Sequence, residues 1–243
     1  EVHGRPARVV DAATVVLAPS AALLRALPSR PELASPPGTV LGIIDPSGDL
    51  HHTEQTSRVC DRTLVGAAAT QEALRDTLGQ RGLGVLVAAA HVAVTAGRRQ
   101  AGIVLGRGDV GRPAALFGRR RGGTRPKVVG VAACSYSGLE PVTGGEWLGL
   151  APALLWAGAD RVVATLWPLW DTPATDHFTA SIVGRVAAGQ PPPEALRDLM
   201  IDALDATAAS APVSPSPADT PPAPGLVWAS FVCVAARAAA VEG

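Results

Sequence analysis

Short apolar runs rich in β-branched residues alternate along this chain with stretches whose apolar residues recur at helical spacing. This alternation is typical of βαβ units, in which crossover helices join parallel strands. Some runs, such as residues 128–133 (VVGVAA), are apolar at every position, which is the pattern of strands covered on both faces. The sequence therefore predicts an α/β fold, a three-layer α/β/α sandwich with a mostly parallel central sheet.

The expected elements run through the whole chain. Residues 206–225 (ATAASAPVSPSPADTPPAPG) contain too much Pro, Ala and Ser to pack, which predicts a flexible insertion before the last strand. An apolar run follows the insertion, so we expect residues 1–243 to form a single domain. We expect strands at residues 14–17, 39–44, 84–90, 102–105, 127–133, 161–167 and 226–234, and helices at 69–78, 146–156, 173–187 and 193–204.

Composition and charge exclude several classes of protein. Hydrophobic residues make up 47% and charged residues 17%, which excludes a disordered chain, and 21 basic residues balance 21 acidic ones. The only dense basic run, residues 119–121, is flanked by glycine and is interpreted as a solvated loop, so we expect no nucleic-acid partner. No uninterrupted apolar stretch reaches transmembrane length. We expect a cytoplasmic protein that does not bind a membrane.

The three cysteines, Cys60, Cys134 and Cys233, are scattered and form no CxxC pair. They predict neither a disulfide framework nor a zinc site, and they fit a reducing compartment. We expect no metal and no cofactor.

Two buried runs end in residues that can act together as a nucleophile and its base. Residues 85–90 lead into His91, and residues 128–133 lead into Cys134. In open α/β sheets, ligands bind beyond the carboxyl ends of the strands. An imidazole beside a thiol stabilises the thiolate and later protonates the leaving group. A lone cysteine after a strand is more often a packed core residue, so it is the joint placement that favours catalysis.

The remaining histidines and cysteines lie in less suggestive places. His3, His51, His52 and His177 fall in terminal, loop or helix contexts, and Cys60 and Cys233 are interpreted as structural. A nucleotide site is a further alternative, because residues 106–111 (GRGDVG) match GxGxxG after a candidate strand. Arg112 and Pro113 follow at once, no amphipathic helix opens there, and no GxxxxGK[ST] occurs, so this alternative is set aside.

Two stretches resemble the CHAT domain, a caspase-like peptidase family related to separase. They are residues 128–138 (VVGVAACSYSG) and 146–171 (EWLGLAPALLWAGADRVVATLWPLWD). Weaker matches at 17–27, 42–50, 189 with 193–196, and 228–231 extend the resemblance over nearly the whole chain. It implies a caspase-like sandwich and a cysteine endopeptidase that cleaves an exposed loop of a protein.

The resemblance assigns roles residue by residue. Cys134 takes the place of the nucleophile and His91 that of the base, with the backbone N–H groups of Cys134 and Val92 as the oxyanion hole. The family usually has Gly where this chain has Val92, and Ser137-Gly138 arrives one residue later than in the family pattern. A β-branched residue is costly if the site needs a positive φ. A catalytically weak or inactive module acting in protein–protein regulation is therefore the alternative function.

Specificity and regulation follow from the same resemblance. Asp171 matches the acid that reads a basic P1 residue in related peptidases, and the small Ala132 would leave room for a long P1 side chain. Asp171 also fits a helix start, with Thr172 and Pro173 after it. Because the chain begins with Glu1, we expect it to be part of a longer bacterial protein, in which an activating protein or an upstream helical-repeat domain controls the peptidase in an immune-like system.

Overall fold

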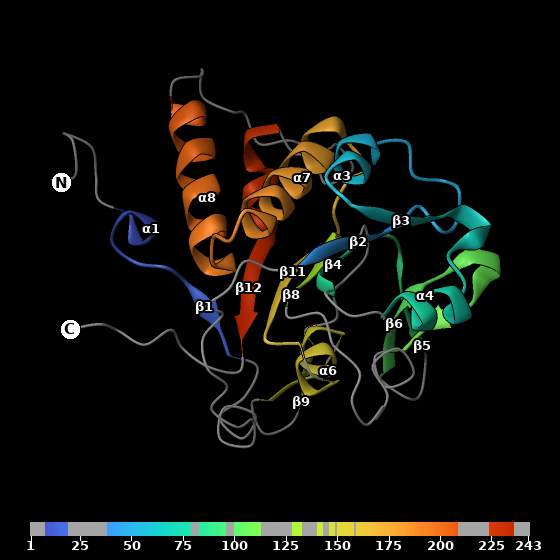
Figure 1. The fold of residues 1–243 in the computed structure, drawn as a ribbon. Helices are drawn as coiled ribbons and strands as arrows, with labels where there is room; N and C mark the ends of the chain where they lie inside the picture. The colour runs from blue at the N-terminus through green and yellow to red at the C-terminus, as the bar shows by residue number, and fades with distance from the viewer. Residues whose placement is uncertain are drawn as a thin grey trace.

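A mixed seven-stranded sheet forms the centre of the computed structural model, with strand order β1-β12-β11-β8-β4-β2-β3 (Figure 1). The structure describes residues 8–18, 38–78, 83–95, 100–112, 128–132, 140–142, 146–148, 150–157, 159–208 and 224–235. The strands of this sheet are β1 (Val16–Leu17), β2 (Thr39–Ile44), β3 (Arg62–Val65), β4 (Leu83–Ala89), β8 (Val128–Ala132), β11 (Arg161–Thr165) and β12 (Phe231–Ala235).

The sheet is parallel from β3 to β11 and changes direction at one side. β12 pairs antiparallel with β11, and β1 pairs parallel with β12. The α/β class is confirmed, and the sheet is mostly parallel as expected, with one antiparallel pairing, between β11 and β12. Two helices in succession, α7 (Pro173–Ala187) and α8 (Pro192–Ala208), connect β11 to β12. They return the chain to the edge where β11 ends, so β12 runs the opposite way.

Helices and core residues cover both faces of the sheet. Along β4, Val85 and Val87 belong to one buried cluster, and Leu86 and Ala88 belong to the other. This alternation follows from the two-residue period of a strand. The first cluster includes α7 and α8, and the second includes α4 (Gln71–Leu78) and α6 (Leu150–Ala157), on the opposite side of the sheet (Figure 1).

Directly after β4 the chain enters a second, three-stranded antiparallel sheet made of β5 (Val92–Thr95), β6 (Gln100–Val104) and β7 (Val110–Gly111). The strand expected at 102–105 is present as β6, but it belongs to this second sheet. The GxGxxG match falls in the 3-10 turn η2 (Gly106–Gly108) and in β7, so it does not open a helix.

Three further expectations were wrong at their boundaries. Residues 146–148 begin no helix but form β10 (Glu146–Leu148), which pairs with β9 (Glu140–Val142), because antiparallel pairing overrides the helical pattern there. The last strand starts at Phe231, since η3 (Pro224–Ser230) precedes it. The insertion expected at 206–225 is shorter than predicted, because residues 206–208 end α8 and residues 224–225 begin η3. Residues 209–223 lie outside the described residues.

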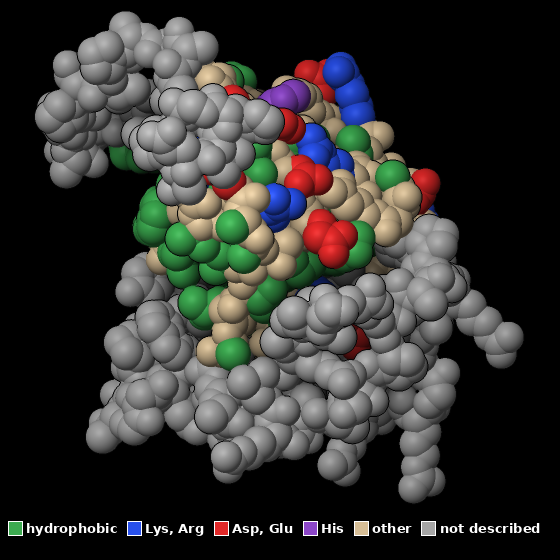
Figure 2. Space-filling view, turned by 90° about the vertical axis from the view of Figure 1, so that its left-hand side faces the viewer, with side chains coloured by type: hydrophobic (Ala, Val, Ile, Leu, Met, Phe, Trp, Pro, Cys, Tyr) green, Lys and Arg blue, Asp and Glu red, His purple; other side chains and the backbone are tan. Residues whose placement is uncertain are grey.

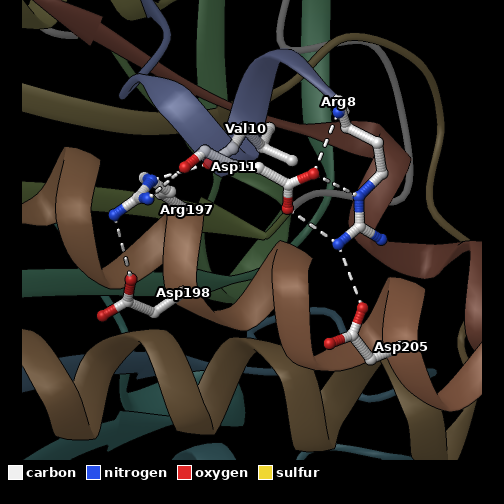
Figure 3. Close-up of polar contacts among 6 residues, drawn as sticks. All are labelled: Arg8, Val10, Asp11, Arg197, Asp198 and Asp205. Atoms are coloured by element: carbon white, nitrogen blue, oxygen red, sulfur yellow. Dashed lines mark hydrogen bonds and ion pairs between the residues drawn. The ribbon is translucent and has the colours of Figure 1, made fainter. Parts of the chain in front are cut away.

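The N-terminal helix α1 (Val9–Ala12) is tied to α8 by arginines (Figure 3). The Arg8 guanidinium contacts Asp11 at 2.8 Å and Asp205 at 3.0 Å. Arg197 donates to the carbonyl oxygens of Val10 at 2.7 Å and Asp11 at 2.9 Å. Figure 2 shows acidic and basic side chains close together on this side of the molecule. Within the described part of the chain, no helix combines the length and apolar character needed to cross a membrane.

Candidate active site at the carboxyl edge of the central sheet

The loops that follow the parallel strands β2, β4 and β11 lie at one edge of the sheet, the edge of the strands' carboxyl ends. Ile44 at the end of β2 is the register partner of Ala89 in β4, and the N–H of Asp45 donates to the carbonyl oxygen of Ala89 at 2.9 Å. The loop after β2 therefore starts against the end of β4, where His91 follows. This edge is where ligands bind in open α/β sheets.

The sheet register relates His91 to the proposed nucleophile. Ala89 of β4 pairs with Ala132 of β8. In the sequence, His91 comes two residues after Ala89, and Cys134 comes two residues after Ala132. Cys134 itself lies outside the described residues, and Ala132 is described only as part of strand β8. The two chain segments thus leave matched positions on neighbouring parallel strands.

The His91 imidazole meets a carboxylate that the sequence did not single out. Its Nε2 lies 3.0 Å from Oδ1 of Asp49, and the hydroxyl of Ser47 donates to the same oxygen at 2.6 Å. The His91 side chain is 32% exposed and that of Asp49 64%. Hydrogen bonds from Ser47 and from His91 lower the pKa of the Asp49 carboxyl below its usual value.

The contact with Asp49 determines which ring nitrogen of His91 carries the proton. At neutral pH the Asp49 carboxylate is ionised and can only accept hydrogen bonds. Nε2 of His91 is therefore the donor in this contact. In the neutral ring, Nδ1 is then the nitrogen with a free lone pair, and it can act as a base.

Two aspartates build the loop that carries Asp49. Asp45, whose φ of 43° is positive, accepts the backbone N–H groups of Gly48, Asp49 and Leu50 on one oxygen, Oδ1, at 2.9–3.0 Å. Asp171, after β11, accepts the next two N–H groups, of residues 51 and 52, at 2.6 and 3.0 Å. Five consecutive backbone donors, from residue 48 to residue 52, are thus bound by two carboxylates.

The family model for the CHAT domain matches residues 6–236. This chain belongs to the CHAT domain family. The match includes all the described elements from α1 to β12. It associates the chain with caspase-like peptidases. A comparison with curated proteins gave no match.

In this CHAT domain, Asp171 lies in the loop after β11. Its two carboxylate oxygens already accept one backbone N–H each. A carboxylate offers about four lone-pair positions, so, counting only donors among the described residues, about two remain for another donor. The helix start expected near Asp171 is confirmed for its neighbours: Thr172 is the N-cap of α7, with its hydroxyl accepting from the N–H of Thr175, and Pro173 opens the helix.

Val92 fits the CHAT domain backbone without strain. It is buried, lies in β5, and pairs in register with Ile103. Outside glycine, the described residues with positive φ are Asp45 and Arg107. The steric cost that a β-branched residue would meet at positive φ therefore does not arise. The carbonyl of His91 accepts from the N–H of Val104 at 2.8 Å, which fixes the start of β5.

The two described cysteines of the CHAT domain, Cys60 and Cys233, have the packed surroundings that the sequence predicts. Burial raises the pKa of the Cys60 thiol to about 11, with Asp61 adding to the effect, and that of Cys233 to about 12. The Sγ of Cys60 donates to the carbonyl of Thr56. Neither thiol forms a useful fraction of thiolate at neutral pH.

Apolar side chains border this edge of the CHAT domain. Leu166, Trp167 and Trp170 follow β11 and are exposed, whereas Leu169 between them is buried. Among the described residues, no group of three or more His, Cys, Asp or Glu side chains is placed to hold a metal ion.

Proposed function

We propose that this CHAT domain is a cysteine endopeptidase that cleaves a protein substrate, with Cys134 as nucleophile and His91 as base. The observation that carries the proposal is the β4–β8 register. Ala89 pairs with Ala132, and His91 and Cys134 each follow two residues later. Because the strands are parallel, both segments leave the sheet at the same edge.

The proposed chemistry has four steps. Nδ1 of His91 takes the proton of the Cys134 thiol, and the thiolate attacks the carbonyl carbon of the scissile peptide bond. Backbone N–H groups of Cys134 and Val92 stabilise the oxyanion, and losing one such donor costs about 3 kcal/mol of barrier lowering. The imidazolium then protonates the amine as the C–N bond breaks. Water hydrolyses the thioester and restores the thiol.

The caspase-like three-layer sandwich is part of the same proposal. Helices on both faces of the sheet and an antiparallel β12 beside β11 support it. The two core clusters place α7 and α8 on one side of the strands that carry the site, and α4 and α6 on the other.

We also propose that Asp171 and Ala132 form the S1 subsite and favour Arg or Lys at P1. Asp171 follows β11 and Ala132 ends β8, the strand beside it. A carboxylate with open lone pairs pairs well with a guanidinium or ammonium group, and it disfavours an acidic P1 residue. Fluorogenic peptides that differ only at P1 test this. We expect cleavage after Arg to exceed cleavage after Leu, and equal rates would refute the S1 assignment.

The nucleophile is tested without a known substrate, by alkylation with iodoacetamide at about pH 7 and peptide mass spectrometry. A pKa of about 11 leaves about one Cys60 thiol in ten thousand as thiolate at that pH. We expect Cys134 to react much faster than Cys60 and Cys233, and His91→Ala to remove that advantage. Slow labelling of all three cysteines would contradict the proposal and favour the inactive regulatory module.

Cleavage gives the second test. Once a peptide is found, Cys134→Ala and His91→Ala should each abolish its cleavage, and the melting temperature should change little because in the sequence each residue comes two positions after a paired strand residue, Ala132 or Ala89.

We further propose that the peptidase works in the bacterial cytoplasm under the control of an activating protein or a neighbouring helical-repeat domain, as the family resemblance suggests. Co-expression with candidate neighbours, read out by the same peptide, tests this regulation.

A further inference from the structure

We propose that Asp49 is a positioning residue of this peptidase, which holds the His91 imidazole so that Nδ1 faces the reaction as the base. The inference rests on the proposed roles of Cys134 and His91. Its geometric basis is the 3.0 Å contact between Asp49 Oδ1 and His91 Nε2. The reactive unit is therefore a carboxylate, an imidazole and a thiol rather than a dyad.

The contact fixes both the ring and its proton. A carboxylate that accepts from Nε2 leaves Nδ1 to accept a proton from a thiol. After that transfer the ring is an imidazolium, and the negative charge of Asp49 stabilises it. The thiolate–imidazolium pair is the reactive form of a cysteine peptidase. Asp49 thus raises the population of reactive thiolate without touching the thiol.

Side-chain hydrogen bonds hold the backbone of the loop around Asp49. The side chain of Asp45 binds the backbone N–H groups of residues 48–50, and Asp171 binds those of residues 51 and 52. The Ser47 hydroxyl donates to the same Asp49 oxygen that meets His91, at 2.6 Å. An exposed carboxylate can position a ring only when its own backbone is held, and here both ends of the loop are held.

Alkylation of Cys134 by iodoacetamide tests the inference, with Asp49→Ala and Asp49→Asn as the variants. The Asp49 side chain is 64% exposed, so both proteins should fold, which circular dichroism checks. We expect the labelling rate of Cys134 to fall by about two- to five-fold in Asp49→Ala, the range of an exposed ion pair. Asp49→Asn keeps the shape but loses the charge, so it should also label more slowly than wild type.

Chemical rescue separates this role from a merely structural one. Asp49→Ala removes a carboxylate that solvent can reach, so added formate should restore part of the labelling rate, whereas the same concentration of chloride should not. The matched control is Asp202→Ala, which removes another exposed acid, paired with Arg185 on the far helix pair, and should label like wild type.

The outcomes distinguish the two proposals. If wild-type Cys134 labels as slowly as Cys60, the proposed peptidase function fails. If wild type labels fast and His91→Ala labels slowly, while both Asp49 variants keep the wild-type rate, only the role of Asp49 fails. A slow Asp49→Ala that responds equally to formate and chloride also overturns it.

Discussion

Asp176 on α7 caps a different helix, α3 (Glu54–Arg58), and its removal should destabilise the protein strongly. Asp176 is only 5% exposed. Its carboxylate accepts the N–H of Gln55 at 2.8 Å, the N–H of Thr56 at 2.9 Å and the hydroxyl of Thr56 at 2.7 Å. The N-cap residue of α3, Thr53, makes no side-chain capping bond of its own. The first turn of α3 therefore depends on an acid that lies 120 residues further along the chain.

The expected cost of Asp176→Ala follows from these three bonds. Each hydrogen bond to a charged group contributes about 1.5–3 kcal/mol, and desolvation of the buried carboxylate offsets part of the sum. The variant leaves two N–H groups without their acceptor, and the Thr56 hydroxyl keeps only its longer contact, 3.3 Å, to the backbone carbonyl of residue 176. We expect a loss of about 4 kcal/mol in the free energy of unfolding, a large share of the roughly 5–15 kcal/mol of a typical domain. Asp176→Asn should cost about 2 kcal/mol, since its amide keeps one acceptor oxygen.

Urea unfolding followed by circular dichroism measures these differences. Asp202→Ala is the matched control, because Asp202 is an exposed acid with one ion pair to Arg185, and its removal should cost less than about 1 kcal/mol. A loss for Asp176→Ala no larger than that of the control would refute the capping role. Iodoacetamide labelling of the same variant should also slow, because α3 follows the loop that carries Asp49.

Three further predictions concern the core and the site loop. Burial raises the pKa of the Cys233 thiol to about 12, against 9.0 when unfolded, so the protonated thiol contributes fully to stability below pH 9 and this contribution is lost as the pH rises towards 12. Cys233→Ala should therefore remove about 1.4 kcal/mol per pH unit from the pH dependence of the unfolding free energy between about pH 9.5 and 11. An unchanged slope would contradict this. A Cβ at Gly106 would lie 2.7 Å from a backbone oxygen of η1 (Gly66–Ala68), whereas one at Gly184 in α7 meets open space. In urea unfolding, Gly106→Ala should therefore destabilise the protein by about 2 kcal/mol, and Gly184→Ala should stabilise it by about 0.5–1 kcal/mol. The reverse order would refute the packing around Gly106. Asp171→Ala should accelerate amide hydrogen exchange at residues 51 and 52 far more than in α7, and unchanged protection would show that the acid does not hold the loop.

The elements with strong local signals were predictable from the sequence. The range expected for β2 and that expected for α7 agree with the structure at both ends, because one is a continuous apolar run and the other begins with a Thr-Pro start. β3 gave no such signal, since three of its four residues are exposed and the strand lies at the edge of the sheet. Strand pairing with β2, rather than its own composition, makes it a strand.

The site was predictable only in part, for a related reason. His91 stands out because a long buried run leads to it. Asp49 does not stand out, because an exposed acid in a turn is common, and what gives it significance is a contact 42 residues away along the chain. The bonds from Asp171 to residues 51 and 52 span about the same 120 residues as those of Asp176. Tertiary packing determines such contacts, so no local sequence pattern predicts them.

The pairing of β4 with β8 also determines which changes in chain length this domain can accept. One extra residue inside either strand would shift it by about 3.3 Å and turn its later side chains to the opposite face of the sheet. Residues 92–127 contain the β5–β7 sheet and lie between His91 and β8, and a change in their number leaves the register of Ala89 and Ala132 as it is. Relatives of this protein should therefore vary in length between β4 and β8, yet keep the same count of residues from each paired alanine position to the histidine and to the cysteine.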